Sequence, residues 1–157
     1  MPEVKGALAL GRVVEVEITE KGLHAKVQRL DRAPGVISDW ITVSSAMAGP
    51  ECGVLFAPEP DDIAVIGHAG ERPLILGFIT GASAGAASEE TNERVIASRD
   101  KNMIVLVDGS SSGITIRDSN DNEIVMDQSG ITMKSSGEIT IEAGGTCAVK
   151  GATVELN

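Results

Sequence analysis

The sequence predicts an all-β protein in which a small N-terminal barrel precedes a trimeric, intertwined β-helix, or β-prism. The last third of the chain, Met103 to Leu156, repeats an apolar-x-apolar step, which is the period-two pattern of short strands with one buried face. Gly, Asn, Asp and Ser fill the intervals between the steps, as expected for regularly spaced turns. Residues 8–80 alternate apolar and polar positions without a helical pattern of convincing length.

The N-terminal part reads as about five short strands. Residues 12–19 alternate, with Val14, Val16 and Ile18 on the apolar face, and residues 23–30 return after a Lys-Gly turn as a hairpin with one wet face. The remaining apolar runs, separated by Gly and Pro, are 40–43, 53–57, 63–66 and 74–79. This pattern predicts a five-stranded barrel of the OB type in preference to another small barrel or a sandwich.

The segment 81–93 changes in character, because it is rich in small residues and then in acids and has no periodic apolar face. Such a composition is typical of a linker between domains. We therefore expect an OB domain with its lead-in at 1–80, a linker at 81–93 and a trimeric β-helix at 94–157.

The repeat implies several chains, because a strand with two inward residues cannot bury a core alone. One possible architecture is a single-chain solenoid of two or three coils, which is at or below the minimum for stability. The favoured one is a prism in which each level takes one strand from each of three identical chains and neighbouring chains cover each strand edge. The residues expected in the trimer core are Ile104, Leu106, Ile114, Ile116, Ile124, Met126, Ile131, Met133, Ile139, Ile141, Cys147, Val149, Val154 and Leu156. The residues expected on the outer face are Val105, Thr115, Val125, Thr132, Thr140, Ala148 and Glu155.

Composition bounds the possible partners and compartments. The net charge is −10, and Trp40, Phe56 and Phe78 are the only aromatic residues, so the chain is a poor candidate for binding nucleic acid. Cys52 and Cys147 have neither disulfide-framework nor metal-site spacing. No signal peptide or transmembrane helix is visible, which predicts synthesis in the cytoplasm.

No group of residues in the sequence supports catalysis or a cofactor. His24 and His68 stand alone, without a partner at metal-ligand spacing. The acids at 61–62 suggest either an acid/base pair or turn capping, and turn capping is favoured. The serines at 110–112 read as a hairpin turn, and 118–122 reads as a polar turn, because it lacks the offsets of a calcium loop. The chain is therefore expected to be no enzyme and to hold no metal or cofactor.

Three runs carry a family resemblance: WITV from residue 40, GVLFAPEPDDIAVI from residue 53 and RPLILGFITG from residue 72. Together with the downstream repeat, they resemble the contractile-tail spike proteins. These are the baseplate spikes of contractile phages and the valine-glycine repeat proteins of type VI secretion and extracellular contractile injection systems. In that family an OB domain is followed by a trimeric β-helix, and here the resemblance extends from about residue 10 to the end.

The chain also departs from these relatives. The hub domain ahead of the OB domain, the inserted lysozyme domain and the His-x-His iron site of some tips are all missing from the sequence. It therefore resembles the minimal form of the spike.

The resemblance implies a structural role and a set of partners. The chain would be a homotrimeric rod beneath the tube or hub of a phage tail or related contractile injection particle, and this virion or particle component would help to puncture the target envelope. A hub or baseplate protein would meet the OB end, near the lead-in from Pro2 to Leu10. A small conical tip protein, similar to the proline-alanine-alanine-arginine (PAAR-like) repeat family, would meet the other end. The residues expected to contact it are Thr153, Val154, Glu155, Leu156 and Asn157. The envelope would be touched only transiently.

One alternative function belongs to a different class. The chain would then be an OB-fold binding module for an oligonucleotide or oligosaccharide, carried on an oligomerising β-solenoid stalk. Such a module needs basic or aromatic residues on its exposed sheet, and the strands here offer few.

Overall fold

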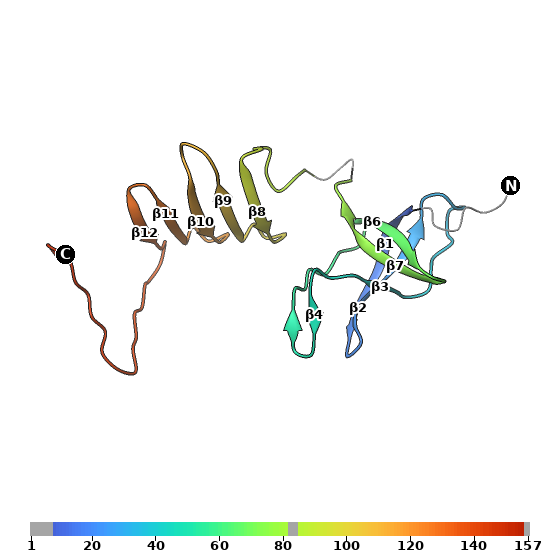
Figure 1. Cartoon of the computed structure of the whole chain (residues 1–157), viewed down its shortest axis with the longest axis horizontal. Helices are drawn as coiled ribbons and strands as arrows, with labels where there is room; N and C mark the ends of the chain where they lie inside the picture. Colours follow the sequence, from blue (N-terminus) through green and yellow to red (C-terminus); the bar gives the residue numbers. More distant parts are fainter. Residues whose placement is uncertain (1–7, 82–84, 156–157) are drawn as a thin grey trace. The chain divides into compact units, whose positions relative to one another are not determined.

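A computed structural model describes residues 8–81 and 85–155, and this part of the chain is all β, with twelve strands and no helix (Figure 1). The chain divides into two compact units, Met1–Ala86 and Ala87–Asn157. The lead-in before Leu8, the middle of the expected linker and the last two residues lie outside the described residues. The prediction of an all-β fold is confirmed.

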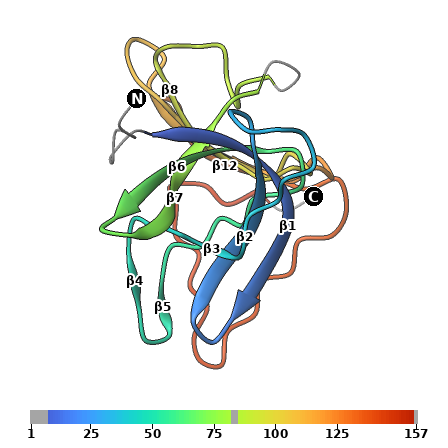
Figure 2. The same cartoon turned by 90° about the vertical axis from the view of Figure 1, so that its right-hand side faces the viewer.

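The first unit is a closed barrel with the strand order β1-β2-β3-β7-β6 (Figure 2). Its strands are β1 (Ala9–Thr19), β2 (Gly22–Arg29), β3 (Ile41–Val43), β6 (Ile63–Ala69) and β7 (Arg72–Ile79). β3 and β7 pair in parallel and the other neighbours pair antiparallel, with β1 against β6 closing the barrel. The predicted five-stranded barrel is therefore confirmed.

The barrel core is aliphatic. Its largest fully buried side chains are Val13, Val27, Ile66 and Ile75. Smaller residues let the strands approach closely: a Cβ on Gly11 would lie only 2.9 Å from Cδ1 of Ile66. The barrel therefore fills its narrow interior with β-branched residues and leaves no room for a side chain at Gly11.

The expected apolar face of the first strand is wrong at Val14. The pairing of β1 with β2 shifts register between Val13 and Glu15, so Val14 is the extra residue of a β-bulge. Val13 is 1 % exposed and lies in the core, whereas Val14 is 39 % exposed. Val16 still packs against the core, but Ile18 is exposed near the strand end. A bulge moves every residue on one side of it to the opposite face, and a strict two-residue period cannot reveal it.

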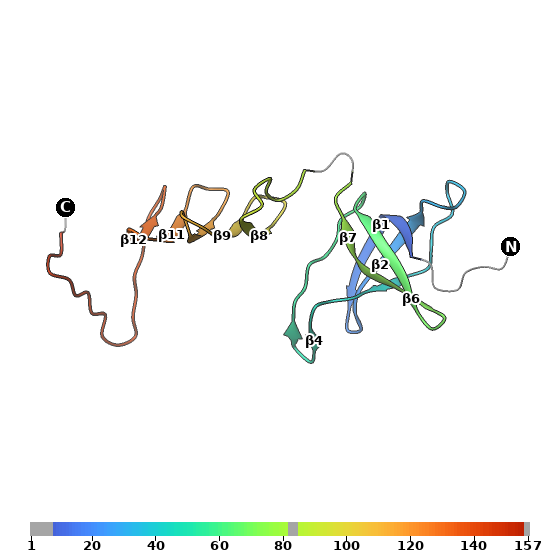
Figure 3. The same ribbon diagram turned by 45° about the horizontal axis from the view of Figure 1, so that its top comes forward.

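The apolar run at 53–57 is not a barrel strand. The chain between β3 and β6 forms a small antiparallel hairpin of β4 (Ala48–Gly49) and β5 (Cys52–Gly53), which projects from the barrel (Figure 3). All residues of 44–57 are exposed. We call the segment 44–57 the arm.

The second unit contains one five-stranded antiparallel meander. Its strands are β8 (Glu93–Ala97), β9 (Met103–Val107), β10 (Gly113–Arg117), β11 (Glu123–Asp127) and β12 (Gly130–Lys134). Each strand pairs with the next one along the chain, as Figure 1 shows. The single-chain solenoid is therefore wrong for residues 93–134. The expectation that neighbouring chains cover every strand edge is also wrong for the edges between β8 and β12, because these strands pair with one another within one chain.

The chain after the meander has no hydrogen-bonded strand of its own. From Ser135 to Glu155 the structure assigns no strand, and apart from Ser135 every residue is exposed. The expected strand steps at Ile139/Ile141 and Cys147/Val149 fall in this segment, as does Val154, while Leu156 lies outside the described residues. We call residues 135–155 the tail.

Candidate assembly interface

Two apolar rows cross the meander sheet from strand to strand. The register pairs Ile114 with both Leu106 and Met126, and Met126 with Ile131. These residues form the first row. In the second row, Ile116 pairs with both Ile104 and Ile124, and the row ends at Ile96 on one side and at Met133 on the other. Because side chains directly opposite one another share a face, the first four expected core pairs lie together on one side of the sheet. We call this side the apolar face.

The apolar face is uncovered in the single chain. All its apolar members are exposed except Ile124 and Met126, which are half-buried. Leu106 is 41 % exposed, whereas its neighbour Val105, on the opposite face, is 8 % exposed. The alternation of faces agrees with the expected pattern, but within one chain the larger side chains occupy the more exposed side. Such a contiguous patch of large aliphatic side chains is typical of a contact surface.

The first strand of the meander extends these rows beyond the expected core. Ile96 of β8 stands opposite Ile104, and Arg94 stands opposite Leu106. The Arg94 guanidinium lies at the end of the strands. There it donates to the carbonyl oxygens of Thr91 and Glu93 and lies 3.4 Å from the Asp108 carboxylate. Sequence reasoning missed this strand, because Arg94 interrupts the apolar-x-apolar signal.

Two loops at the same end of the strands share the same conformation. In both 98–102 and 118–122, the N–H of the first residue bonds to the carbonyl of the last. The last residue, Asn102 or Asn122, also donates through its N–H and its side-chain amide to the side chain of Ser98 or Asp118. The fourth residue of each loop adopts a positive φ of 63°. The loops are therefore equivalent turns that close two successive hairpins.

Side chains also join one loop to the next. The Asn102 amide oxygen accepts from the backbone N–H of Ser119, and the Asn122 amide oxygen accepts from the hydroxyl of Ser135. At the opposite end of the strands, the side-chain amide of Gln128 donates to the Ser110 carbonyl. These bonds connect turns that are not neighbours in sequence. They therefore stiffen the sheet at both ends of its strands, along the direction of the apolar rows.

The carboxylate of Asp118 is the most strongly perturbed acid among the described residues. Hydrogen bonds from the Asn122 side chain, from the backbone N–H groups of Asn122 and Asn120 and from the Asn120 side chain lower the pKa of Asp118 from 3.8 to about 2. Because these donors stabilise the charged form, the loop is organised around an ionised Asp118. The structure thus supports the polar-turn interpretation of 118–122.

The remaining sequence candidates do not come together as a reactive site. The Asp62 carboxylate accepts from the Glu59 N–H, and Asp61 lies 3.3 Å from Arg12, as expected for acids at a turn. The His24 ring lies against the Gly22 carbonyl, and His68 is exposed on β6. Across residues 8–81 and 85–155, no three His, Cys, Asp or Glu side chains gather in an arrangement that could hold a metal ion.

Comparison with known proteins identifies both units. Residues 9–82 match the family of type VI secretion system and phage-baseplate injector OB domains. Residues 93–157 match the phage baseplate V C-terminal trimerisation domain. No curated protein sequence matches the chain. Among the residues the structure describes, no helix has both the length and the apolar character needed to cross a membrane.

The two matches follow each other in the order of the two units, and together they cover nearly all of the chain. The first accounts for the closed barrel, which is therefore an OB domain. The second accounts for the meander and the tail, and a trimerisation domain supports a homotrimer. A structural role in a phage baseplate or related injector follows from both. The chain belongs to the baseplate spike family of phage tails and type VI secretion systems.

Proposed function

We propose that the protein is the homotrimeric spike of a contractile injection particle, and that the apolar face forms the core of its shaft. The observation that carries this proposal is the pair of apolar rows, most of whose side chains remain exposed in the single chain. Three copies related by a three-fold axis would bury these rows against one another. The family's trimerisation domain covers this same region.

The sheet has the dimensions of one side of a slender shaft. Five strands spaced by about 4.8 Å span about 19 Å along the rows. Each strand contributes two inward side chains, mostly Ile, Leu or Met, so three sheets would meet in a narrow core without aromatic rings. The bonds between turns at the same end of the strands, such as that from the Ser119 N–H to Asn102, would resist shear along this axis.

The tail would complete the shaft by a different mode of pairing. Its backbone has no strand partner within the chain, yet Ile139, Ile141, Val149 and Val154 keep the apolar spacing and are all exposed. Unpaired backbone and exposed apolar side chains would both be satisfied if the three tails paired with one another. Cys147 and Leu156 would then complete the expected trimer core. In this proposal the chains are separate sheets up to Lys134 and intertwine beyond it.

We assign the shaft a mechanical role and no catalytic one. A rod held beneath the tube would transmit the force of contraction to the target envelope and touch that envelope only transiently. The net charge of −10 disfavours binding to nucleic acid.

The two ends of the assembly would carry different partners. A hub or baseplate protein is proposed at the OB end, near the lead-in that precedes β1. A conical PAAR-like tip protein is proposed on 153–157, where Thr153, Val154 and Glu155 are exposed and the final two residues are outside the described chain. Deleting 153–157 is expected to leave the trimer intact and to abolish binding of a tip protein, measured by co-purification.

The test of the proposed function is the mass of the purified protein in solution. Multi-angle light scattering should give about three times the chain mass of 16.2 kDa. Because the tails would interlock between chains, the trimer is also expected to unfold slowly and to withstand detergent. A monomer at micromolar concentration would contradict the proposal. A trimer that leaves the cell envelope intact in a puncture assay with the assembled particle would contradict the mechanical role alone.

A further inference from the structure

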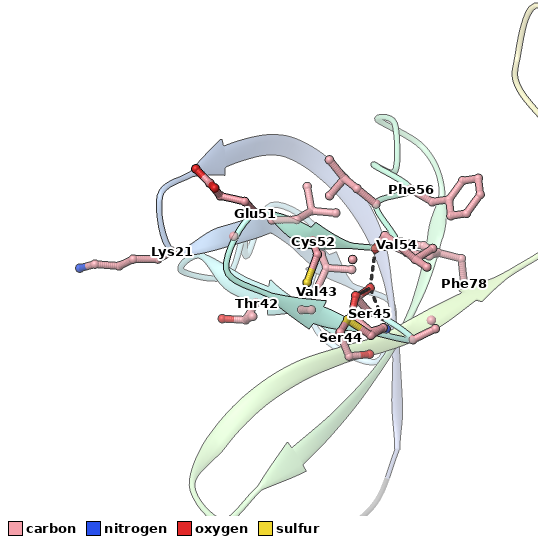
Figure 4. Close-up of a pocket in the computed structure, with 18 residues that line it drawn as sticks. Lys21, Thr42, Val43, Ser44, Ser45, Glu51, Cys52, Val54, Phe56 and Phe78 are labelled. Carbon is pink, nitrogen blue, oxygen red and sulfur yellow. Dashed lines mark hydrogen bonds between the residues drawn. The ribbon is translucent and has the colours of Figure 1, made fainter.

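The barrel carries an open apolar groove that the shaft does not use. The groove encloses about 640 Å³ between the arm, the start of β2 and the end of β7, where Phe78 lies (Figure 4). Its lining includes Met47, Cys52, Val54 and Phe56. Phe56 is 62 % exposed, although it is one of only two phenylalanines in the sequence. We call this hollow the arm groove.

The arm is held in shape by its own chain. The Val54 N–H donates to the Met47 carbonyl over 2.9 Å, and the Ser45 hydroxyl lies within hydrogen-bonding distance of the carbonyl oxygens of both residues. Within 44–57 the only charged residue is Glu51. Depletion of charge and exposure of large apolar side chains are the composition of an interface core. The arm groove is therefore preformed for an apolar surface.

A second apolar patch lies on the outside of the barrel. A Cβ on Gly67 would meet Cδ1 of Leu76 at 2.6 Å and Cδ2 of Leu8 at 3.4 Å, so both leucine side chains lie over the Gly67 backbone. Leu8, Leu10 and Leu76 are all exposed. Neither Leu8, Leu10 nor Leu76 lines the arm groove. We call these three residues the leucine patch.

Three-fold assembly calls for two such surfaces. A cyclic trimer contact is heterologous: one surface of each copy meets a different surface of the next. Thirteen residues, 80–92, join β7 to β8, and they span at most about 47 Å. Trimerisation would hold the neighbouring barrels at an effective concentration on the order of a few millimolar. At that concentration even a weak contact between barrels is populated.

We propose that the arm groove of each barrel receives the leucine patch of a neighbouring copy, so that the three OB domains form a closed ring. This inference rests on the homotrimer of the proposed function. The contact buries Phe56 and Leu8, which are otherwise exposed, and covers Cys52 within the groove. The ring makes the barrel end of the spike a three-fold platform and does not depend on any partner protein.

Cys52 is a built-in reporter for this contact. The experiment uses the full-length protein, confirmed as a trimer by light scattering, and follows alkylation of Cys52 by mass spectrometry of the peptide that contains it. The test variant is Leu8→Asp, which changes the leucine patch and leaves every groove residue in place. The matched control is Val36→Asp, an exposed apolar residue outside both surfaces.

The ring predicts that Leu8→Asp speeds the alkylation of Cys52 by about tenfold, if the contact's intrinsic dissociation constant is a tenth of the tethered concentration. Val36→Asp should leave the rate unchanged. Equal rates in wild type and Leu8→Asp, both trimeric, would overturn the ring while leaving the spike function standing. Protection that arises only after a hub protein is added would assign the groove to that protein and overturn the ring. A monomeric wild type would overturn both proposals.

Discussion

Substitutions at two neighbouring residues of β10 are expected to have opposite relative effects in the trimer and in the isolated chain. Ile116 lies on the apolar face and is 40 % exposed, whereas Thr115 lies on the opposite face between Val105 and Val125 and is half-buried. If the chain worked alone, Thr115→Asp would be the more damaging change, because it adds a charge at the less exposed position. If three apolar faces form a core, Ile116→Asp is the more damaging one.

The size of the effect follows from the geometry. In the trimer, Ile116→Asp would place three carboxylates near one axis, each opposite Ile104 and Ile124 of its own sheet. A buried unpaired charge costs several kcal/mol per ion, so the trimer loses on the order of 10 kcal/mol. Since about 1.4 kcal/mol is a factor of ten, the association constant falls by about seven powers of ten.

The assay is light scattering of the two variants at the same micromolar concentration, with circular dichroism to confirm retained β-structure. Ile116→Asp should run as a monomer near 16.2 kDa, and Thr115→Asp should stay trimeric with a loss of about 1 kcal/mol in the free energy of unfolding. The same contrast is expected in the tail between Ile139→Asp and Thr140→Asp. A trimeric Ile116→Asp, or equal damage at both positions, would refute the assignment of the apolar face to the core.

Two further predictions concern other parts of the chain. Gly11→Ala should destabilise the barrel by about 1–3 kcal/mol through overpacking against Ile66, seen as a lower urea midpoint of Trp40 fluorescence, while the mass stays trimeric; an unchanged midpoint would contradict the close approach. Asp118→Asn should lower stability at neutral pH. Because the folded pKa of Asp118 is lowered from 3.8 to about 2, its contribution is complete above about pH 4 and is lost as the pH falls through about 2. The stability gap between wild type and variant in thermal melts should therefore narrow over that range, and a gap independent of pH would contradict the role of the ionised carboxylate.

The meander was largely predictable because its signal is local. An apolar-x-apolar step fixes both the strand and its face, and the steps at Ile104, Ile114 and Ile124 all became strands in register. What the sequence could not show was the partner of each edge. Short polar turns such as 118–122 let consecutive strands pair within one chain, and that choice depends on backbone geometry, not on apolar period.

The errors in the barrel have a similar physical origin. The bulge at Val14 changes which residues face inward, and because Val13 and Val14 are both apolar, the residue types do not show which of the two enters the core. The apolar run at 53–57 has the composition of a strand, yet it forms part of the projecting arm because Pro58 and Pro60 follow it and interrupt any ladder. The arm groove could not be foreseen, because it exists only once the arm is folded against the start of β2 and the end of β7.

The two equivalent turns at 98–102 and 118–122 define a module of twenty residues. Ile96 and Ile116 occupy the same place in successive modules, as do Ile104 and Ile124, and the register from β8 to β11 places all four on the apolar face. Each module adds two strands, which is about 10 Å along the rows. Duplicating or deleting one module would therefore change the reach of the shaft in fixed steps without altering its cross-section. The length of the shaft can therefore change by whole modules, independently of the surfaces at either end.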